Sequence, residues 1–309
     1  METVVVKLGG AAITNKSIAD TLAPNIHDLV DRVAQVYQDK LRPLGRHLIL
    51  IHGAGSFGHP PAKKYNVKAG WLTPAEATQD KLEDHAQQEE KRRDEVKFGM
   101  AVTRQRVLQL HHHMLQLLQD RARLPALSVS TYDTVETDQG VLTQAASSRL
   151  ITRVNNLLTQ GFVPVLFGDA VLDHAWGTTI LSGDALMHEL ATHLPRVRRC
   201  VFVTDVPGIF TQDPKQYADA VLIRQLHFSE SGDSATYEDD AASSVDDVTG
   251  AMRTKWQWAK RIMADAHQVN RVIICQASVS DTAIGLVGED DGNGLDGGDA
   301  SDAWTTILR

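Results

Sequence analysis

Short apolar runs alternate with longer amphipathic stretches along most of the chain. Runs rich in β-branched residues predict strands at residues 3–8, 47–52, 125–130, 162–167, 199–204, 271–276 and 303–308. Helical spacing of apolar residues predicts helices over residues 24–41, 144–160, 184–194 and 249–267. Buried strands that alternate with amphipathic helices are typical of a parallel sheet covered on both faces. We therefore expect an α/β fold, a three-layer αβα sandwich with a mostly parallel central sheet.

Three polar stretches interrupt this pattern. Residues 73–97 are dense in charge and lack an apolar stripe, so they are expected to form a solvated helix or a lid over a binding site. Residues 229–247 are acidic and small, which predicts a mobile loop. Residues 289–302 are rich in Asp and Gly, but they lack the spacing and the closing Glu of an EF-hand, so no calcium site is predicted there.

Composition limits the class of protein further. The chain has 309 residues, of which 42% are hydrophobic, enough for one large domain or two lobes. The formal net charge is −8 and no Lys/Arg stripe is present, so nucleic acid is not expected as a partner. Cys200 and Cys275 lie in apolar runs, which predicts free, buried thiols in a reducing compartment. Without a visible leader or a long apolar span, we expect a cytoplasmic protein that does not contact membranes.

Two glycine-containing loops follow the first two predicted strands. They are Lys7-Leu8-Gly9-Gly10 and His52-Gly53-Ala54-Gly55-Ser56-Phe57-Gly58-His59. Glycine at the carboxyl end of a strand lets backbone N–H groups approach an anion without interference from a Cβ atom. Two such loops side by side can hold two phosphate groups that face each other. A kinase that acts on a phosphorylated acceptor requires this arrangement.

The second loop also matches the G-x-G-x-x-G spacing of dinucleotide-binding folds through Gly53, Gly55 and Gly58. The acidic residue that such a site needs about twenty residues further on is missing. The chain also lacks the motif G-x-x-x-x-G-K-[ST], which excludes a P-loop kinase. A dinucleotide-dependent dehydrogenase is kept as a third alternative.

Further motifs accompany the glycine loops. They are Ile13-Thr14-Asn15-Lys16, Phe167-Gly168-Asp169-Ala170, Leu181-Ser182-Gly183-Asp184, Thr204-Asp205-Val206-Pro207-Gly208 and Asp247-Val248-Thr249-Gly250. Taken together, the motifs resemble those of the amino acid kinase superfamily along nearly the whole chain. Within it, the two glycine loops are similar to those of the isopentenyl phosphate kinases. The stretch from Gly161 to Asp173 resembles the eukaryotic-type branch of that group.

The resemblance implies ATP-dependent phosphorylation of isopentenyl phosphate to isopentenyl diphosphate, a step in isoprenoid biosynthesis. Dimethylallyl phosphate is a second candidate acceptor, and Mg²⁺ is expected to be carried by ATP, with no metal ligands from the protein. The resemblance also implies a homodimer and one amino acid kinase domain over residues 1–309. Residues 1–170 would form the acceptor-phosphate lobe and residues 171–309 the ATP-binding lobe.

The resemblance also implies roles for individual residues. Lys7, Lys16 and His59 are the expected catalytic residues. Acceptor binding is expected from Ala54, Gly55, Ser56, His59, Gly168 and Asp169. ATP binding is expected from Lys7, Gly9, Gly10, Gly55, Ser182, Asp184, Asp205, Gly208, Lys215, Gly250 and Lys255.

His59 is the residue that discriminates among acceptors. In the resembled group this histidine binds the phosphate of the acceptor, whereas relatives that phosphorylate carboxylates or carbamate lack it. An alkyl phosphate has a second pKa near ~6, so its attacking oxygen is already anionic at neutral pH and needs no general base. The site must instead offset the repulsion between two anions. A cationic or N–H-donating His59 does this, and Lys7 and Lys16 would act as point charges on the transferred group.

Structural alternatives remain for several of these residues. Lys16 can be an exposed loop lysine, Ser56 can cap the segment that follows it, and Asp184 sits where a helix N-cap is expected. His111, His112 and His113 occupy adjacent helical positions, so they are not expected to share a metal. For the whole chain, two further alternatives stay open. One is a sibling kinase for another small phosphate, phosphonate or carboxylate, and the other is a non-catalytic nucleotide sensor.

Overall fold

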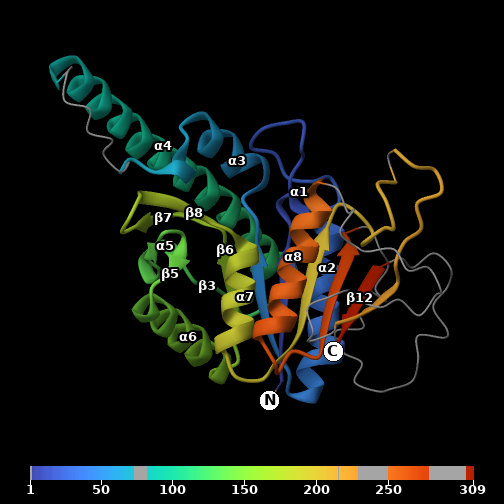
Figure 1. The fold of residues 1–309 in the computed structure, drawn as a ribbon. Helices are drawn as coiled ribbons and strands as arrows, with labels where there is room; N and C mark the ends of the chain where they lie inside the picture. The colour runs from blue at the N-terminus through green and yellow to red at the C-terminus, as the bar shows by residue number, and fades with distance from the viewer. Residues whose placement is uncertain (1, 73–81, 215, 229–249, 278–303) are drawn as a thin grey trace.

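An eight-stranded sheet forms the centre of the computed structural model, which describes residues 2–72, 82–214, 216–228, 250–277 and 304–309 (Figure 1). Its strand order is β10-β12-β11-β9-β1-β2-β6-β3. The strands are β1 (Thr3–Leu8), β2 (His47–His52), β3 (Ala126–Ser128), β6 (Val163–Phe167), β9 (Val197–Thr204), β10 (Gln225–His227), β11 (Arg271–Gln276) and β12 (Trp304–Leu308). Neighbouring strands from β11 to β3 pair in parallel, and β12 is antiparallel to β11. The predicted α/β class with a mostly parallel sheet is confirmed.

Helices cover both faces of this sheet. They are α1 (Gly10–Ile13), α2 (Ile26–Val36), α3 (Gly55–Lys64), α4 (Leu82–Gln116), α5 (Thr131–Thr134), α6 (Gln144–Thr159), α7 (Gly183–His193) and α8 (Gly250–Asp265). Because side chains alternate along a strand, Val4 and Val6 pack with α2 and the second half of α4, whereas Val5 packs with α6, α7 and α8. Lys7 shares the face of Val5. The central strand therefore carries a lysine toward α7.

A smaller sheet of four short strands has the order β5-β4-β7-β8. Its members are β4 (Thr137–Asp138), β5 (Val141–Leu142), β7 (Asp169–Asp173) and β8 (Gly177–Leu181). These strands were not predicted, because they are short and β7 buries acidic residues at both ends. Asp173 accepts hydrogen bonds from Thr137 Oγ1 and from the backbone N–H groups of Gly140, Ala175 and Trp176. Its burial is satisfied by polar partners, so the strand does not show an apolar pattern.

The described part of the charged stretch over residues 73–97 lies in a long helix. Residues from Leu82 onward belong to α4, which continues for 35 residues to Gln116 and extends away from the sheet at its first turns (Figure 1). The stretch is thus helical from Leu82, while residues 73–81 lie outside the described part of the chain. The predicted loop at 229–247 and the Asp- and Gly-rich stretch at 289–302 lie outside it as well.

Smaller differences concern element ends and side-chain states. The predicted helix over 24–41 begins at Ile26, after Asn25, and its last turn is a π-helix from Tyr37 to Leu41. Cys200 and Cys275 are free and buried, as predicted, and burial raises the pKa of both thiols. Within the described ranges, no helix combines the length and apolarity needed to cross a bilayer.

Candidate active site

The glycine loops after β1 and β2 touch each other, backbone against backbone. Since β1 and β2 pair in parallel, their carboxyl ends lie at the same edge of the sheet. A Cβ atom at Gly10 would lie 2.5 Å from the nitrogen of Gly55, and a Cβ at Gly53 would lie 2.7 Å from the nitrogen of Gly10. Gly55 has a φ of +50°, a left-handed conformation that favours glycine. The glycines are therefore required for the two loops to approach this closely.

A threonine joins the two loops through hydrogen bonds. Thr14 Oγ1 donates to the carbonyl of Gly10 at 2.7 Å and accepts the backbone N–H of Ser56 at 2.9 Å. The Ser56 hydroxyl donates to the carbonyl of Thr21 at 3.4 Å. Helix α3 begins at Gly55, and its N-cap residue Ala54 makes no side-chain cap. The capping alternative for Ser56 is therefore wrong.

Three backbone N–H groups of the second loop have no acceptor within the described part of the chain. They belong to Ala54, Gly55 and Phe57, at the start of α3. The first N–H groups of a helix point away from its body and carry partial positive charge. The loop thus presents hydrogen-bond donors that can meet an anion.

The glycine-rich sequence had indicated that His59 lies in a loop. In the structure it lies on α3. The sequence hid this helix because Pro60 and Pro61 lie inside it, and proline usually interrupts helices. His59 is at the surface, but the surrounding protein atoms and the charges of Lys7 and Lys255 lower the pKa of its imidazole. The lowered pKa favours the uncharged imidazole in the free protein. Of the two predicted forms, the neutral N–H donor is the one favoured.

A buried carboxylate joins two lysines beside these loops. Lys7 Nζ lies 2.5 Å from Asp184 Oδ1, and Lys255 Nζ lies 3.1 Å from Asp184 Oδ2. The three residues come from β1, α7 and α8. The predicted capping role of Asp184 is wrong, because Ser182 is the N-cap of α7 and its hydroxyl accepts the N–H of Ala185 at 3.1 Å. The carboxylate of Asp184 is therefore available to pair with both lysines.

The cluster of Lys7, Asp184 and Lys255 has a net positive charge. Burial lowers the pKa of Lys7 to about 8, although the nearby Asp184 carboxylate raises it in part. Burial also acts to raise the pKa of Asp184, but the charges of Lys7 and Lys255 outweigh it and lower that pKa. At neutral pH two ammonium groups thus share one carboxylate, which leaves one positive charge in excess. Such a cluster attracts phosphate oxygens in a site of low polarity.

A second ion pair links the loop after α1 to the end of β9. Lys16 Nζ pairs with Asp205 Oδ2, and both side chains are partly exposed. Burial acts to raise the pKa of Asp205, but the hydrogen bond from Lys16 lowers it overall. Lys16 is an exposed loop lysine, as the structural alternative stated, yet it has a defined partner in the second half of the chain.

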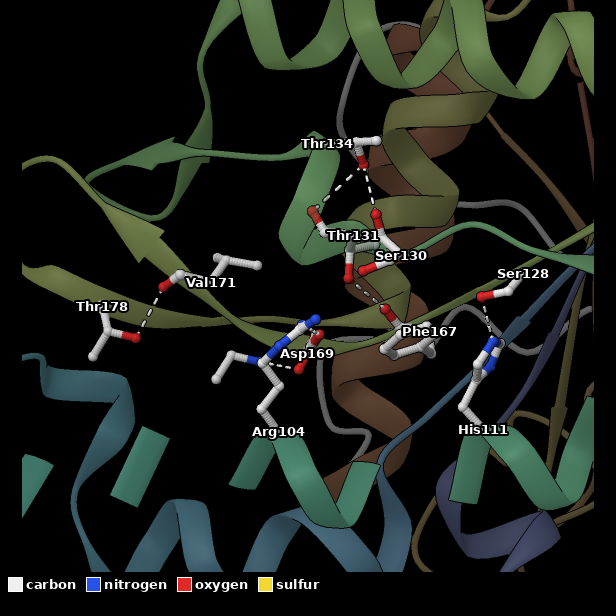
Figure 2. Close-up of polar contacts among 11 residues, drawn as sticks. Arg104, His111, Ser128, Ser130, Thr131, Thr134, Phe167, Asp169, Val171 and Thr178 are labelled. Carbon is white, nitrogen blue, oxygen red and sulfur yellow. Dashed lines mark hydrogen bonds and ion pairs between the residues drawn. The ribbon is translucent and has the colours of Figure 1, made fainter. Parts of the chain in front are cut away.

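Asp169 is buried at the start of β7 and pairs with Arg104 of α4 (Figure 2). The Arg104 guanidinium stacks on the Tyr132 ring at 4.0 Å from its centroid, and Asp169 also accepts the N–H of Ala170 at 2.8 Å. Burial raises the pKa of Asp169 to about 7 despite the nearby Arg104 charge. Sequence reasoning missed Arg104, since it is one of many charged residues on α4 and follows no motif.

The remaining predicted residues have different surroundings. The N–H of Gly9 donates to the carbonyl of Val203 at 2.7 Å, which ties the first loop to β9. Gly208 packs against β12, where a Cβ would lie 2.4 Å from Thr305 Oγ1, so it has a structural reason to be glycine. Gly250 is the first residue of α8, and Lys215 lies outside the described residues. In the described ranges, no three His, Cys, Asp or Glu side chains are grouped to hold a metal.

Comparison with known proteins identifies the family. The model of the amino acid kinase family matches residues 2–275. An isopentenyl phosphate kinase of Arabidopsis thaliana is 33% identical over 221 residues, which are 67% of this chain and 58% of that protein. The chain thus spans less than two thirds of the plant relative. An isopentenyl phosphate kinase of Methanothermobacter thermautotrophicus is 31% identical over 252 residues, or 81% of this chain and 82% of the relative.

Solved structures show the same fold. An X-ray structure of an isopentenyl phosphate kinase matches with a TM-score of 0.68 and 24% identity, covering 99% of this chain and all of that one. A substrate complex of an isopentenyl phosphate kinase matches with a TM-score of 0.66 and 20% identity, over 99% of this chain and 100% of that chain. At these identities the structures support the fold alone. The plant and archaeal relatives match at similar identity, which leaves the eukaryotic-type branch a prediction.

Replacing Gly10 with Ala tests the contact between the loops. The added Cβ would overlap the backbone of Gly55, so we expect the loops to separate at a cost of about 1–3 kcal/mol in stability and at least ~100-fold in phosphoryl transfer. Gly45→Ala is the control, because it strains a positive φ of 65° where a Cβ meets no atom within 4 Å. Melting temperature and turnover are measured for both variants. If Gly10→Ala and Gly45→Ala lose the same stability and have the same turnover, the prediction is contradicted.

The pKa of Lys7 predicts opposite pH trends for activity and stability. Above about pH 8 Lys7 loses its proton in the folded protein, so kcat/KM for ATP should fall. The unfolded chain holds this proton up to its ordinary pKa of 10.5, so unfolding takes up a proton between about pH 8 and 10.5. The contribution of Lys7 to the free energy of unfolding should therefore increase with pH across that range. Denaturant titration of the native protein and of Lys7→Met measures it, and an identical pH slope in both would show that Lys7 is not the titrating group.

Proposed function

Because the chain belongs to the amino acid kinase family, we propose that it transfers the γ-phosphoryl group of ATP to isopentenyl phosphate. The products are isopentenyl diphosphate and ADP, which places the reaction in isoprenoid biosynthesis. The observation that carries the proposal is the position of His59, on a helix that starts at the glycine loops and within electrostatic reach of Lys7 and Lys255. The names of the plant and archaeal relatives support the same acceptor.

The proposed chemistry needs no general base. The acceptor phosphate is an anion at neutral pH, and one of its oxygens forms a bond to the γ-phosphorus while the bond to the β–γ bridging oxygen breaks. ADP leaves with the electron pair of that bond. The barrier arises largely from repulsion between the acceptor and the triphosphate. The cluster of Lys7, Asp184 and Lys255 offsets this repulsion with its excess positive charge.

His59 and the free N–H groups of the second loop act on the acceptor in this proposal. A neutral imidazole N–H and the N–H groups of Ala54 and Gly55 donate hydrogen bonds to the acceptor phosphate. Asp169 pairs with Arg104 and its pKa is raised to about 7, so it repels the phosphate less than a fully ionised, unpaired carboxylate would. We assign Ser56 and Gly168 to the same region on sequence resemblance.

ATP is proposed to lie on the side of the second half of the chain. Lys7, Lys255 and Asp184 lie at its phosphates, and Lys16 reaches the transferred group from its pairing with Asp205. We propose that the N-terminus of α8 at Gly250 contacts the same partner, and the remaining ATP residues are proposed on resemblance. They are Gly9, Gly10, Gly55, Ser182, Gly208 and Lys215. Members of the family typically use Mg²⁺ with ATP, which supplies charge neutralisation at the phosphate oxygens when bound.

The wider assignments follow the same proposal. Residues 1–170 supply the acceptor lobe and residues 171–309 the ATP lobe of one domain whose central sheet is continuous through β1 and β9. Dimethylallyl phosphate is proposed as a second acceptor. We also propose that the protein forms a homodimer and that it belongs to the eukaryotic-type branch.

An acceptor screen tests the function directly. Purified protein with Mg²⁺ and ATP is assayed for ADP release with isopentenyl, dimethylallyl and geranyl phosphate, glutamate and aspartate. We expect turnover with isopentenyl phosphate above all others and none with the amino acids. Turnover of an amino acid but of no alkyl phosphate would identify a sibling kinase. Absence of ADP release with every acceptor would favour a nucleotide sensor.

Substitution of His59 tests its role toward the acceptor. His59→Ala removes a hydrogen bond to a charged group, worth about 2–3 kcal/mol, so kcat/KM for isopentenyl phosphate should fall roughly 30- to 150-fold. His59→Gln keeps a neutral N–H donor, so kcat/KM should fall less than in His59→Ala. Lys63→Ala, on the same helix, is the control. If kinetics with His59→Ala match the native protein, the imidazole does not bind the acceptor.

A further inference from the structure

A chain of hydrogen bonds runs through the protein interior behind the second glycine loop. Ser128 Oγ lies 2.7 Å from His111 Nε2, His111 Nδ1 lies 2.9 Å from His52 Nε2, and His52 Nδ1 lies 3.0 Å from the carbonyl oxygen of Gly53 (Figure 2 shows the first of these contacts). The three side chains come from β3, α4 and the end of β2. Both imidazoles are buried. The chemistry proposed above uses neither of them.

The direction of every hydrogen bond in this chain can be assigned. The Gly53 carbonyl can only accept, so His52 carries its proton on Nδ1. Burial lowers the pKa of His52 to about 4 and that of His111 to about 3, so both rings are neutral. His52 Nε2 must then accept from His111 Nδ1–H, and His111 Nε2 must accept from the Ser128 hydroxyl. Each ring therefore has one donor and one acceptor, and both are satisfied.

The last hydrogen bond determines where the Gly53–Ala54 peptide points. In a trans peptide the C=O and the following N–H point in opposite directions. Since His52 draws the Gly53 carbonyl toward the interior, the N–H of Ala54 points away from it, and no acceptor for that N–H exists among the described residues. The backbone carbonyl of His52 also accepts the N–H of Gly168 at 3.1 Å. One residue thus holds both loops to which acceptor binding is assigned.

We propose that His52 and His111 are positioning residues that orient the Ala54 N–H toward the acceptor phosphate. This inference rests on the proposed function, because it assigns the second glycine loop to the acceptor. Helix α4 supports the same region twice, through His111 and, two turns earlier, through Arg104 on Asp169. The ring of His52 stacks on those of His111 and Phe167, and the latter two rings are tilted, with 4.2 Å between their centroids. Phenylalanine at position 111 would keep this packing, so packing alone does not account for histidine there.

Variants at position 111 separate positioning from packing. His111→Phe removes both hydrogen bonds but keeps a ring. His111→Asn keeps an N–H donor near the Nδ1 position and can restore the bond to His52. Leu110→Val, at the neighbouring buried position of α4, is the matched control for core destabilisation. KM is measured separately for the acceptor and for ATP, with whichever acceptor the native protein uses in the screen.

We expect His111→Phe to raise KM for the acceptor at least ~10-fold while KM for ATP changes less than ~2-fold. In His111→Asn the acceptor KM should return most of the way to the native value. Leu110→Val should lower the melting temperature without changing either KM. An unchanged acceptor KM in His111→Phe, or equal changes in both KM values, would overturn the proposal.

A second measurement does not depend on turnover. Nitrogen-15 NMR of labelled histidines should show Nδ1–H tautomers for His52 and His111 at pH 7. The Ala54 amide resonance should shift on addition of inorganic phosphate in the native protein and shift less in His111→Phe. An Nε2–H tautomer at His52, or equal Ala54 shifts in both proteins, would refute the positioning role. If isopentenyl phosphate is not an acceptor but these signals appear, only the proposed substrate is wrong.

Discussion

The site depends on one carboxylate placed between two ammonium groups. Burial lowers the pKa of Lys7 to about 8 even with the Asp184 carboxylate beside it. Without Asp184, Lys7 and Lys255 would repel each other and the pKa of Lys7 would fall further. With Asp184 between them, one carboxylate offsets one of the two lysine charges, and one positive charge remains in excess. In the proposed reaction this excess positive charge attracts the phosphate groups of both substrates. A site with equal numbers of both charges would not offset their repulsion.

The fold brings the donors of this site together through the geometry of parallel strands. The ends of β1, β2 and β9 lie at one edge of the sheet, and each is followed by a tight turn. Gly10 and Gly55 let two of these turns touch, and Thr14 joins them by hydrogen bonds. The backbone N–H groups are held by neighbouring backbone, so they require little reorganisation to meet an anion.

Much of the fold was predictable, because buried parallel strands are continuous apolar runs and their helices have amphipathic spacing. The positions of Lys7, Asp184 and Lys255 could be proposed from motifs, but their ion pairs depend on contacts over 177 and 71 residues. Helix α3 was not predicted because Pro60 and Pro61 lie inside it and proline usually interrupts helices. Strand β7 was not predicted because it buries Asp169 and Asp173. Arg104 and the His52–His111 chain could not be predicted, since α4 has no motif and its register against β2 arises only on folding.

The most direct test of the account is the affinity of a compound that joins both substrates, adenosine tetraphosphate esterified with isopentenol. If the excess charge and the two loops hold the triphosphate and the acceptor phosphate in line, calorimetry should show this compound binding at least ~100-fold more tightly than ATP alone. Binding no tighter than ATP would mean that the second phosphate group has no site beside the first. That result would contradict the account.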